Sequence, residues 1–184
     1  MPPKVRIHRE EIIEAGIDIV RTQGEAALNA RSVAAVLQCS TQPVFSNFAT
    51  MQELRLAVIA EAEKLYKACM QQEMNHHPPY KASGMAYIRF AKEEKELFKL
   101  LFMRDRSDEV IPEQTELDCQ MEQMVHSGTG LEGEEARLFH LEMWAYVHGI
   151  AVILASGYLE LDMARVSRML TDAYQGLKKQ FRKE

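Results

Sequence analysis

Apolar residues recur along this chain at intervals of three and four positions, the spacing that places them on one face of an α-helix. The chain shows no sustained alternation of apolar and polar residues and no Asn-Gly or Asp-Gly turn that would indicate a β-hairpin. The pattern therefore predicts an all-α protein. The clearest stripe comprises Val166, Met169, Leu170, Ala173, Tyr174, Leu177 and Phe181.

Caps and breakers divide this helical pattern into elements. Longer helices are expected over residues 9–22, 51–75, 80–92, 93–104, 112–126, 134–156 and 162–183. A short helix is expected after an Asn29 N-cap, and a second one is opened by Ser40 or Thr41 with Pro43 in its first turn. Thr50 and Glu53 have the spacing of a capping box. In the first short helix four residues are expected to face inward: Val33, Ala34, Val36 and Leu37.

The 184-residue composition is that of an ordinary globular protein, with a net charge of −5. Residues 1–50 carry five basic and five acidic residues, so residues 51–184 hold the whole negative charge. The N-terminal part is therefore the less repellent end for a polyanion such as DNA. Three widely spaced cysteines imply no disulfide framework, and neither a signal peptide nor a membrane span is expected. We interpret the chain as a cytoplasmic protein.

Residues 30–48 have the plan of a helix-turn-helix, in which the second short helix enters the DNA major groove. Gln and Asn side chains can read adenine edges, Thr can contact phosphate or base, and Arg31 is placed to reach a phosphate. The alternative is a helical hairpin whose polar face is simply solvated. The residues expected to contact DNA are Arg31, Thr41, Gln42, Val44, Phe45 and Asn47.

Several motifs in order make the chain resemble the TetR family of transcriptional repressors. The N-terminal motifs are Ile12-x-x-Ala15-Gly16-x-x-Ile19, Gly24, residues 28–34, residues 40–48 and Glu53-Leu54. The C-terminal motifs are residues 90–93, residues 97–102 and the Trp144–Ile150 stretch, which looks like part of a dimerisation helix. The resemblance implies a three-helix DNA-binding domain at residues 1–50 and a helical ligand-binding and dimerisation domain at residues 51–184. It also implies a homodimer that binds a double-stranded operator, with a small-molecule effector controlling that binding.

Two departures from the family pattern bear on DNA affinity. Phe45 stands where the family usually has a tyrosine, and Met51 stands where it usually has a lysine; both family residues typically contact phosphates. The absence of each phosphate contact is expected to weaken DNA binding without changing sequence choice. Basic residues of the N-terminal arm (Lys4, Arg6 and Arg9) are the candidates for compensation. The turn also has Gln38-Cys39 where the family often has a glycine.

The resemblance places an effector site in the C-terminal part but does not select its residues. Methionine and aromatic side chains are typical of adaptable apolar cavities, although they are more often simply core. The candidates for an apolar or aromatic effector are Tyr66, Met70, Tyr87, Phe98, Phe102, Met121 and Met124. Residues 143–158 are apolar on nearly every face, so that helix is expected to be buried all round, either in a dimer interface or in an intramolecular core.

No cofactor, metal site or enzymatic chemistry is expected. His140 and His148 lie two helical turns apart, too far to share one metal ion. The chain has no nucleophile elbow, phosphate-binding glycine loop or His-Glu-x-x-His motif. The alternative function is a helical small-molecule carrier or interaction protein whose helix-turn-helix no longer binds DNA.

Overall fold

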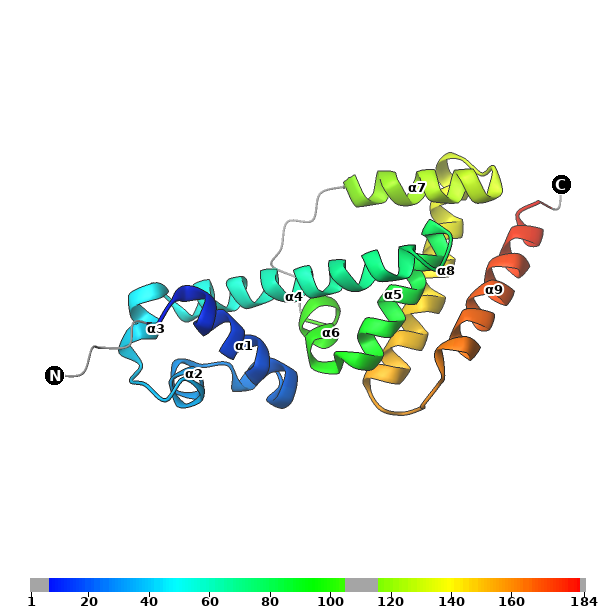
Figure 1. Ribbon diagram of the computed structural model, residues 1–184. Coiled ribbons are helices and arrows are strands. Elements are labelled where there is room, and N and C mark those ends of the chain that lie inside the picture. Colours follow the sequence, from blue (N-terminus) through cyan, green and yellow to red (C-terminus); the bar gives the residue numbers. More distant parts are fainter. Residues whose placement is uncertain (1–6, 105–115, 183–184) are drawn as a thin grey trace. The chain divides into compact units, whose positions relative to one another are not determined.

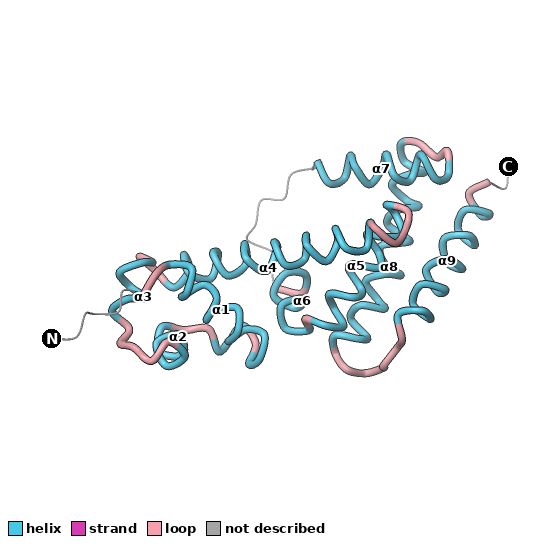
Figure 2. Tube along the Cα trace, viewed as in Figure 1, coloured by secondary structure: helices cyan, strands magenta, loops and turns pink. Residues whose placement is uncertain are grey.

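The computed structural model describes residues 7–104 and 116–182, and every regular element within these ranges is a helix (Figure 1 and Figure 2). The elements are α1 (Arg9–Gln23), a 3-10 helix η1 (Glu25–Ala27), α2 (Ala30–Val36), α3 (Gln42–Asn47), α4 (Met51–Met74), α5 (Pro79–Glu93), α6 (Lys95–Phe102), α7 (Glu116–Thr129), α8 (Gly133–Ala155) and α9 (Met163–Gln180). The predicted all-α fold class is confirmed.

The helix ends lie close to those expected from sequence, and the differences have local causes. The helix expected from residue 93 begins at Lys95, because Glu94 has non-helical backbone angles and takes the N-cap position. At the start of α9, the Asp162 carboxylate accepts a hydrogen bond from the Arg165 backbone N–H (2.7 Å). The start of the helix expected over residues 112–126 lies outside the described residues.

The described residues form two compact units, one of residues 7–65 and 94–104 and the other of residues 66–93 and 116–182. α4 runs through both units, because its first part packs in the first unit and residues 66–74 pack in the second. A functional boundary after residue 50 stays a prediction.

The core of the first unit joins α1, α2, α3, the first part of α4 and α6. α1 and α4 approach closely at Gly16, where an added Cβ would lie 2.6 Å from Cγ2 of Val58. The Arg21 guanidinium donates two hydrogen bonds to the Glu94 carboxylate (2.8 and 3.0 Å), which attaches the start of α6 to α1. Large, fully buried side chains of this core include Ile12, Ile19, Val33, Phe48, Leu54, Leu97 and Phe98.

In the second unit, α5 lies along α8 and also contacts α7 and α9. Near the end of α4 the buried carboxylate of Glu73 pairs with Arg89 of α5, so this charge is compensated inside the unit. A second cluster joins α7 to α8 and is covered partly by Tyr80 and by aromatic and aliphatic side chains of α9. Its buried members are Val125, Leu131, Ala136, Phe139 and Met143.

One side of α8 is exposed in the single chain. Its apolar side chains on that side are Leu138, Leu141, Trp144 and Tyr146, and Leu141 is 57% exposed. Of the two expected ways to bury this helix, the intramolecular core alone is therefore wrong, and burial in a dimer interface stays a prediction. Within the described residues α8 is also the one helix long and apolar enough to cross a bilayer by length and composition, a test that core helices of soluble proteins pass as well.

Candidate nucleic-acid interface

The first helix of the predicted helix-turn-helix is fixed by its cap. The Asn29 side chain accepts hydrogen bonds from the backbone N–H groups of Arg31 (3.0 Å) and Ser32 (3.1 Å). In return the Ser32 hydroxyl accepts one from the Asn29 N–H (3.1 Å). The predicted Asn29 cap is confirmed, and it places Arg31 in the first turn of α2 with its side chain exposed.

A tight turn then joins α2 to α3. The Cys39 N–H donates to the Ala34 carbonyl (2.9 Å), closing the end of α2. Gln38 takes the left-handed conformation, with φ of 51°, and is the one non-glycine residue with positive φ in the described ranges. This is the turn where the family often has glycine, which explains that preference physically.

α3 begins after Thr41 with Pro43 in its first turn, as predicted. Val44 and Phe48 point into the core and are 0% and 1% exposed, so they set the rotation of the helix. The prediction that the Val44 side chain contacts DNA is therefore wrong, because a fully buried side chain cannot reach a base edge. Val36, expected to face inward, is instead 49% exposed.

The opposite side of α3 is open to solvent. Gln42 and Phe45 are exposed and lie three residues apart, hence on neighbouring positions of one helix face. Thr41 is half-buried at the N-cap. Asn47 is half-buried as well, and its side-chain amide donates to the Pro43 carbonyl (2.9 Å). Gln42 and Phe45 are thus the most accessible of the predicted contacts on this helix.

Arg9 has a role that the sequence analysis missed. Its guanidinium donates to the Asn47 carbonyl (2.6 Å), pairs with Glu53 (3.0 Å) and lies 3.9 Å above the Phe48 ring. The Ala49 N–H and this guanidinium together hold the pKa of the Glu53 carboxyl below its usual value. Arg9 therefore anchors the end of α3 to α1 and α4, whereas Lys4 and Arg6 lie outside the described residues.

The first unit also has an acidic depression, which lies between α1 and the end of α2. Glu11, Glu14 and Asp18 of α1 line a depression of about 210 Å³ together with Val36 and Leu37. Between Glu25 and Glu53 the only charged residue is Arg31. The α2–turn–α3 segment itself thus carries one positive charge and no negative one, while the carboxylates of α1 disfavour approach of a polyanion along their own face.

The predicted effector residues fall into separate groups. In the second unit the rings of Tyr66 and Tyr87 pack edge to face (6.3 Å), and Phe90 packs on Tyr66 (5.5 Å). Met70 lies one turn after Tyr66 on α4, and Met121 and Met124 lie on α7. Phe98 and Phe102 contact each other in the first unit (5.2 Å), where Phe98 is fully buried.

Two tyrosine–histidine pairs cross from α5 to α8, and the sequence analysis did not foresee them. Tyr80 Oη lies 3.1 Å from Nδ1 of His140, and Tyr87 Oη lies 2.9 Å from Nδ1 of His148. Burial raises the pKa of both phenols, so each phenol stays protonated at neutral pH. The tautomer of each histidine decides which of the two groups donates. The Trp144 ring in turn stacks on His148 (5.0 Å). An aromatic chain thus runs from Tyr66 through Tyr87 to the exposed side of α8.

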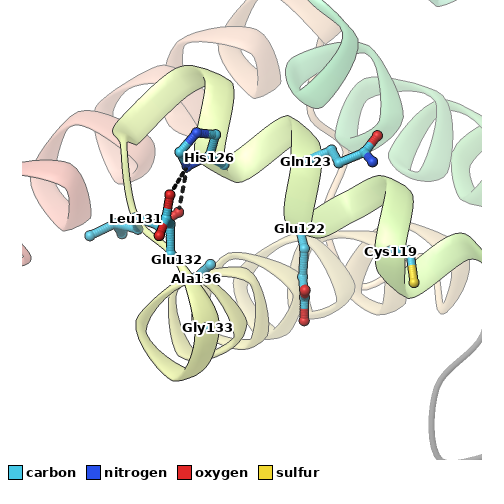
Figure 3. A pocket seen from close by; sticks show the side chains of 8 residues that line it. All are labelled: Cys119, Glu122, Gln123, His126, Leu131, Glu132, Gly133 and Ala136. Atoms are coloured by element: carbon cyan, nitrogen blue, oxygen red, sulfur yellow. Dashed lines mark hydrogen bonds and ion pairs between the residues drawn. The ribbon is translucent and has the colours of Figure 1, made fainter.

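A further depression of about 330 Å³ lies between α7 and the start of α8 (Figure 3). It is open to solvent, and none of the predicted effector residues lines it. Its lining residues are Cys119, Glu122, Gln123, His126, Leu131, Glu132, Gly133 and Ala136. Throughout the described part of the chain no group of His, Cys, Asp and Glu side chains has the geometry of a metal site.

Comparison with known proteins identifies relatives of this architecture. A family model described as tetracyclin repressor-like, C-terminal domain, matches residues 80–174, more than half of the chain. A member of the TetR family from Streptomyces coelicolor A3 is 19% identical, aligned over 90% of this chain and 96% of its own, with a TM-score of 0.60. The multidrug binding protein EbrR, solved in complex with imidazole, is 18% identical over 90% of this chain and 88% of its own, with a TM-score of 0.57. No curated protein matches the chain.

Proposed function

This chain belongs to the TetR family of transcription regulators, and from that premise we propose that it is a homodimeric repressor whose operator binding is controlled by a small-molecule effector. The observation that carries the proposal is the α2–turn–α3 unit. Its buried side is fixed by Val44 and Phe48, and its open side presents Gln42 and Phe45, with Arg31 on α2. The fold of this family is generally that of a non-enzymatic regulator, and we propose a cytoplasmic location.

The exposed apolar side of α8 supports the homodimer. Two copies that pack α8 and α9 together would cover Leu141 and Trp144 from water, as a four-helix interface does. A twofold dimer sets its two α3 helices on successive major grooves, about 34–36 Å apart. The operator we propose is therefore a near-palindromic duplex.

Effector control requires a ligand that binds one state of the dimer better than the other. α4 is the element through which we propose it acts, because this continuous helix belongs to both units. The aromatic chain around Tyr66 and Tyr87, beside Met70, favours an apolar or aromatic effector. EbrR, which shares the fold, is a multidrug binding protein that holds imidazole in its structure, so a planar ligand class is the one to try first.

Selection from a random duplex library tests DNA binding directly. We expect a near-palindromic consensus. Arg31→Ala should weaken binding to all sequences and lower the salt slope by about 0.9 for each phosphate that is no longer neutralised, whereas Gln42→Ala should change the preferred base at one position of each half-site. Lys67→Ala, which removes one exposed positive charge from the second unit, is the matched control.

The carrier alternative predicts a different result. Mass spectrometry of an extract of the denatured protein must first show that the folded dimer holds no ligand. If this ligand-free dimer then enriches no duplex at low salt, the repressor proposal is wrong. The missing phosphate-binding groups at Phe45 and Met51 are the feature that favours this alternative.

Restoring a phosphate-binding group provides an independent test. Met51 is half-buried at the first residue of α4. We expect Met51→Lys to tighten binding and to steepen the salt slope by about 0.9 for each additional phosphate that is neutralised, with the same consensus. An altered consensus would contradict this, because phosphate contacts do not read sequence.

Effector binding can be measured by the fluorescence of Trp144, the one tryptophan of the chain. Its ring stacks on His148, which is hydrogen-bonded to Tyr87. We expect aromatic compounds that release the operator to change Trp144 emission. Tyr66→Ala should weaken their binding at least about tenfold, as removal of one packed aromatic ring does. Tyr158→Ala, in an exposed loop position, should leave it unchanged. Equal affinities for the two variants would place the effector elsewhere.

A further inference from the structure

Phe45 is an exposed aromatic side chain on the helix that reads DNA. Its neighbour Val44 is fully buried, and Phe45 itself is 54% exposed on the open side of α3. Its backbone N–H donates to the Thr41 carbonyl (3.3 Å), so the backbone of Phe45 is part of the hydrogen-bonded helix. Phe45 lies on the side of α3 that the proposed function turns toward the major groove, so its ring would meet the base edges when the protein binds DNA.

The chemistry of a phenyl ring restricts that contact. It has no hydrogen-bond donor for a phosphate oxygen, so it cannot supply the contact that a tyrosine hydroxyl would make. In the major groove the one apolar group that distinguishes a base is the C5-methyl of thymine. We propose that Phe45 is a specificity-determining residue that reads a thymine methyl group in each half of the operator, an inference that rests on the proposed DNA-binding function.

The surroundings of Phe45 agree with this role. α3 carries no charged side chain, so direct readout by this helix depends on neutral hydrogen bonds and apolar contacts. Gln42 lies three residues before Phe45 on the same exposed side. Its amide can bind N6 and N7 of adenine, while the thymine of an A·T pair presents its methyl in the same groove. We therefore expect the contacted thymine to lie in the same base pair as the adenine read by Gln42, or in an adjacent pair.

The test removes one methyl group at a time. In a duplex selected by the wild-type protein, each thymine is replaced in turn by deoxyuridine, which differs only in lacking that methyl. We expect one position in each half-site to lose about three- to tenfold in affinity, the value of one buried methyl. Phe45→Ala should bind more weakly and lose this dependence, whereas Ser46→Ala, the next exposed residue, should keep it.

Two additions make the result specific. Cytosine and 5-methylcytosine at the same position should differ by a similar factor for the wild-type protein and not for Phe45→Ala. Phe45→Leu, which keeps an apolar side chain, should retain part of the dependence. We expect the circular dichroism spectrum of each variant to match that of the wild type, because the substituted side chain is exposed.

The outcomes separate this inference from the function on which it rests. If no duplex is selected, the DNA-binding proposal fails and this inference fails with it. If a consensus is selected but no thymine depends on its methyl, or the dependence persists in Phe45→Ala, only the role of Phe45 is wrong. A loss in Phe45→Ala that is equal for thymine and deoxyuridine would assign the ring to the sugar–phosphate backbone instead.

Discussion

At the scale of single residues, Gln38 lowers the stability of the folded protein, because it adopts a backbone conformation that favours glycine. It holds φ of 51° in the turn between α2 and α3, a conformation that costs an L side chain roughly 1–2 kcal/mol and glycine almost nothing. Glycine loses more backbone entropy than glutamine when the chain folds, and this cost offsets part of the strain that is relieved. We therefore expect Gln38→Gly to raise the free energy of unfolding, measured by urea titration, by about 0.5–1 kcal/mol. Ala35→Gly, on the exposed side of α2, is the control and should lower it by about 1 kcal/mol. A loss of stability in Gln38→Gly would contradict the conclusion that the positive φ of Gln38 costs the folded protein stability.

Gly16 is constrained for the opposite reason, lack of space. An added Cβ would lie 2.6 Å from Cγ2 of Val58, so Gly16→Ala should destabilise the protein by about 1–3 kcal/mol despite the better helix propensity of alanine. Val58→Ala makes room, and the double variant should be more stable than the sum of the two single effects predicts. Strictly additive effects would show that α1 and α4 do not meet at this point.

These residues also show what the sequence could predict. The Asn29 cap was predictable because both hydrogen bonds join residues within three positions of each other. The buried position of Val44 was not, since a six-residue helix leaves the direction of its apolar face open. The role of Arg9 depends on Asn47 and Glu53, which are distant along the chain and leave no local signal.

At the scale of elements, α5 and α8 are joined by polar contacts inside an apolar interface. The Tyr80 hydroxyl is hydrogen-bonded to Nδ1 of His140 (3.1 Å), and burial raises the pKa of this phenol. A raised pKa means that above pH 10 the unfolded chain loses the proton while the folded chain keeps it. The stability contributed by this group is therefore complete below pH 10 and is lost as the pH rises above it, by up to about 1.4 kcal/mol per pH unit.

We expect Tyr80→Phe to lower the free energy of unfolding at pH 8 by about 0.5–1.5 kcal/mol, the value of one hydrogen bond. Between pH 10 and 11 the variant should lose less stability than the wild type, because it has no phenol at this position to titrate. Tyr158→Phe, at a residue that is 80% exposed, serves as the control and should follow the wild type at both pH values. Parallel pH profiles for Tyr80→Phe and the wild type would disprove the role of the buried phenol.

Helix positions were predictable because a 3.6-residue period repeats along each segment. The contacts between helices were not, since periodicity identifies an apolar face without its partner. The attachment of α6 to α1 through Arg21 and Glu94 is an example, because the two residues are far apart along the chain, with several other helices between them. The tyrosine–histidine pairs are another, since each residue taken alone is compatible with a core position.

At the scale of the whole molecule, the single chain leaves one apolar surface uncovered. The exposed side of α8 carries Leu141 and Trp144. The sequence indicates that residues 143–158 are apolar on nearly every face, but it does not show what covers them. The proposed homodimer would account for both observations. It would also allow a helix of six residues to suffice for reading DNA, because two copies would bind two half-sites together.

We expect Leu141→Glu to prevent dimerisation. Each leucine buried at the interface contributes about 1.5–3 kcal/mol to the free energy of dimerisation, and twofold symmetry doubles the loss. The introduced carboxylates must also be desolvated. The dimer dissociation constant should therefore rise at least about a hundredfold. Leu56→Glu is closely matched, since Leu56 is 56% exposed and Leu141 57%, but it lies in the first unit and should leave the dimer intact. Analytical ultracentrifugation measures the dimer dissociation constant of both variants.

If Leu141→Glu is monomeric and its stability is unchanged, it should also have lower affinity for the operator, because each monomer then binds only one half-site. A variant that stays dimeric would assign the exposed side of α8 to another partner, and the twofold operator would have to be explained by a different interface.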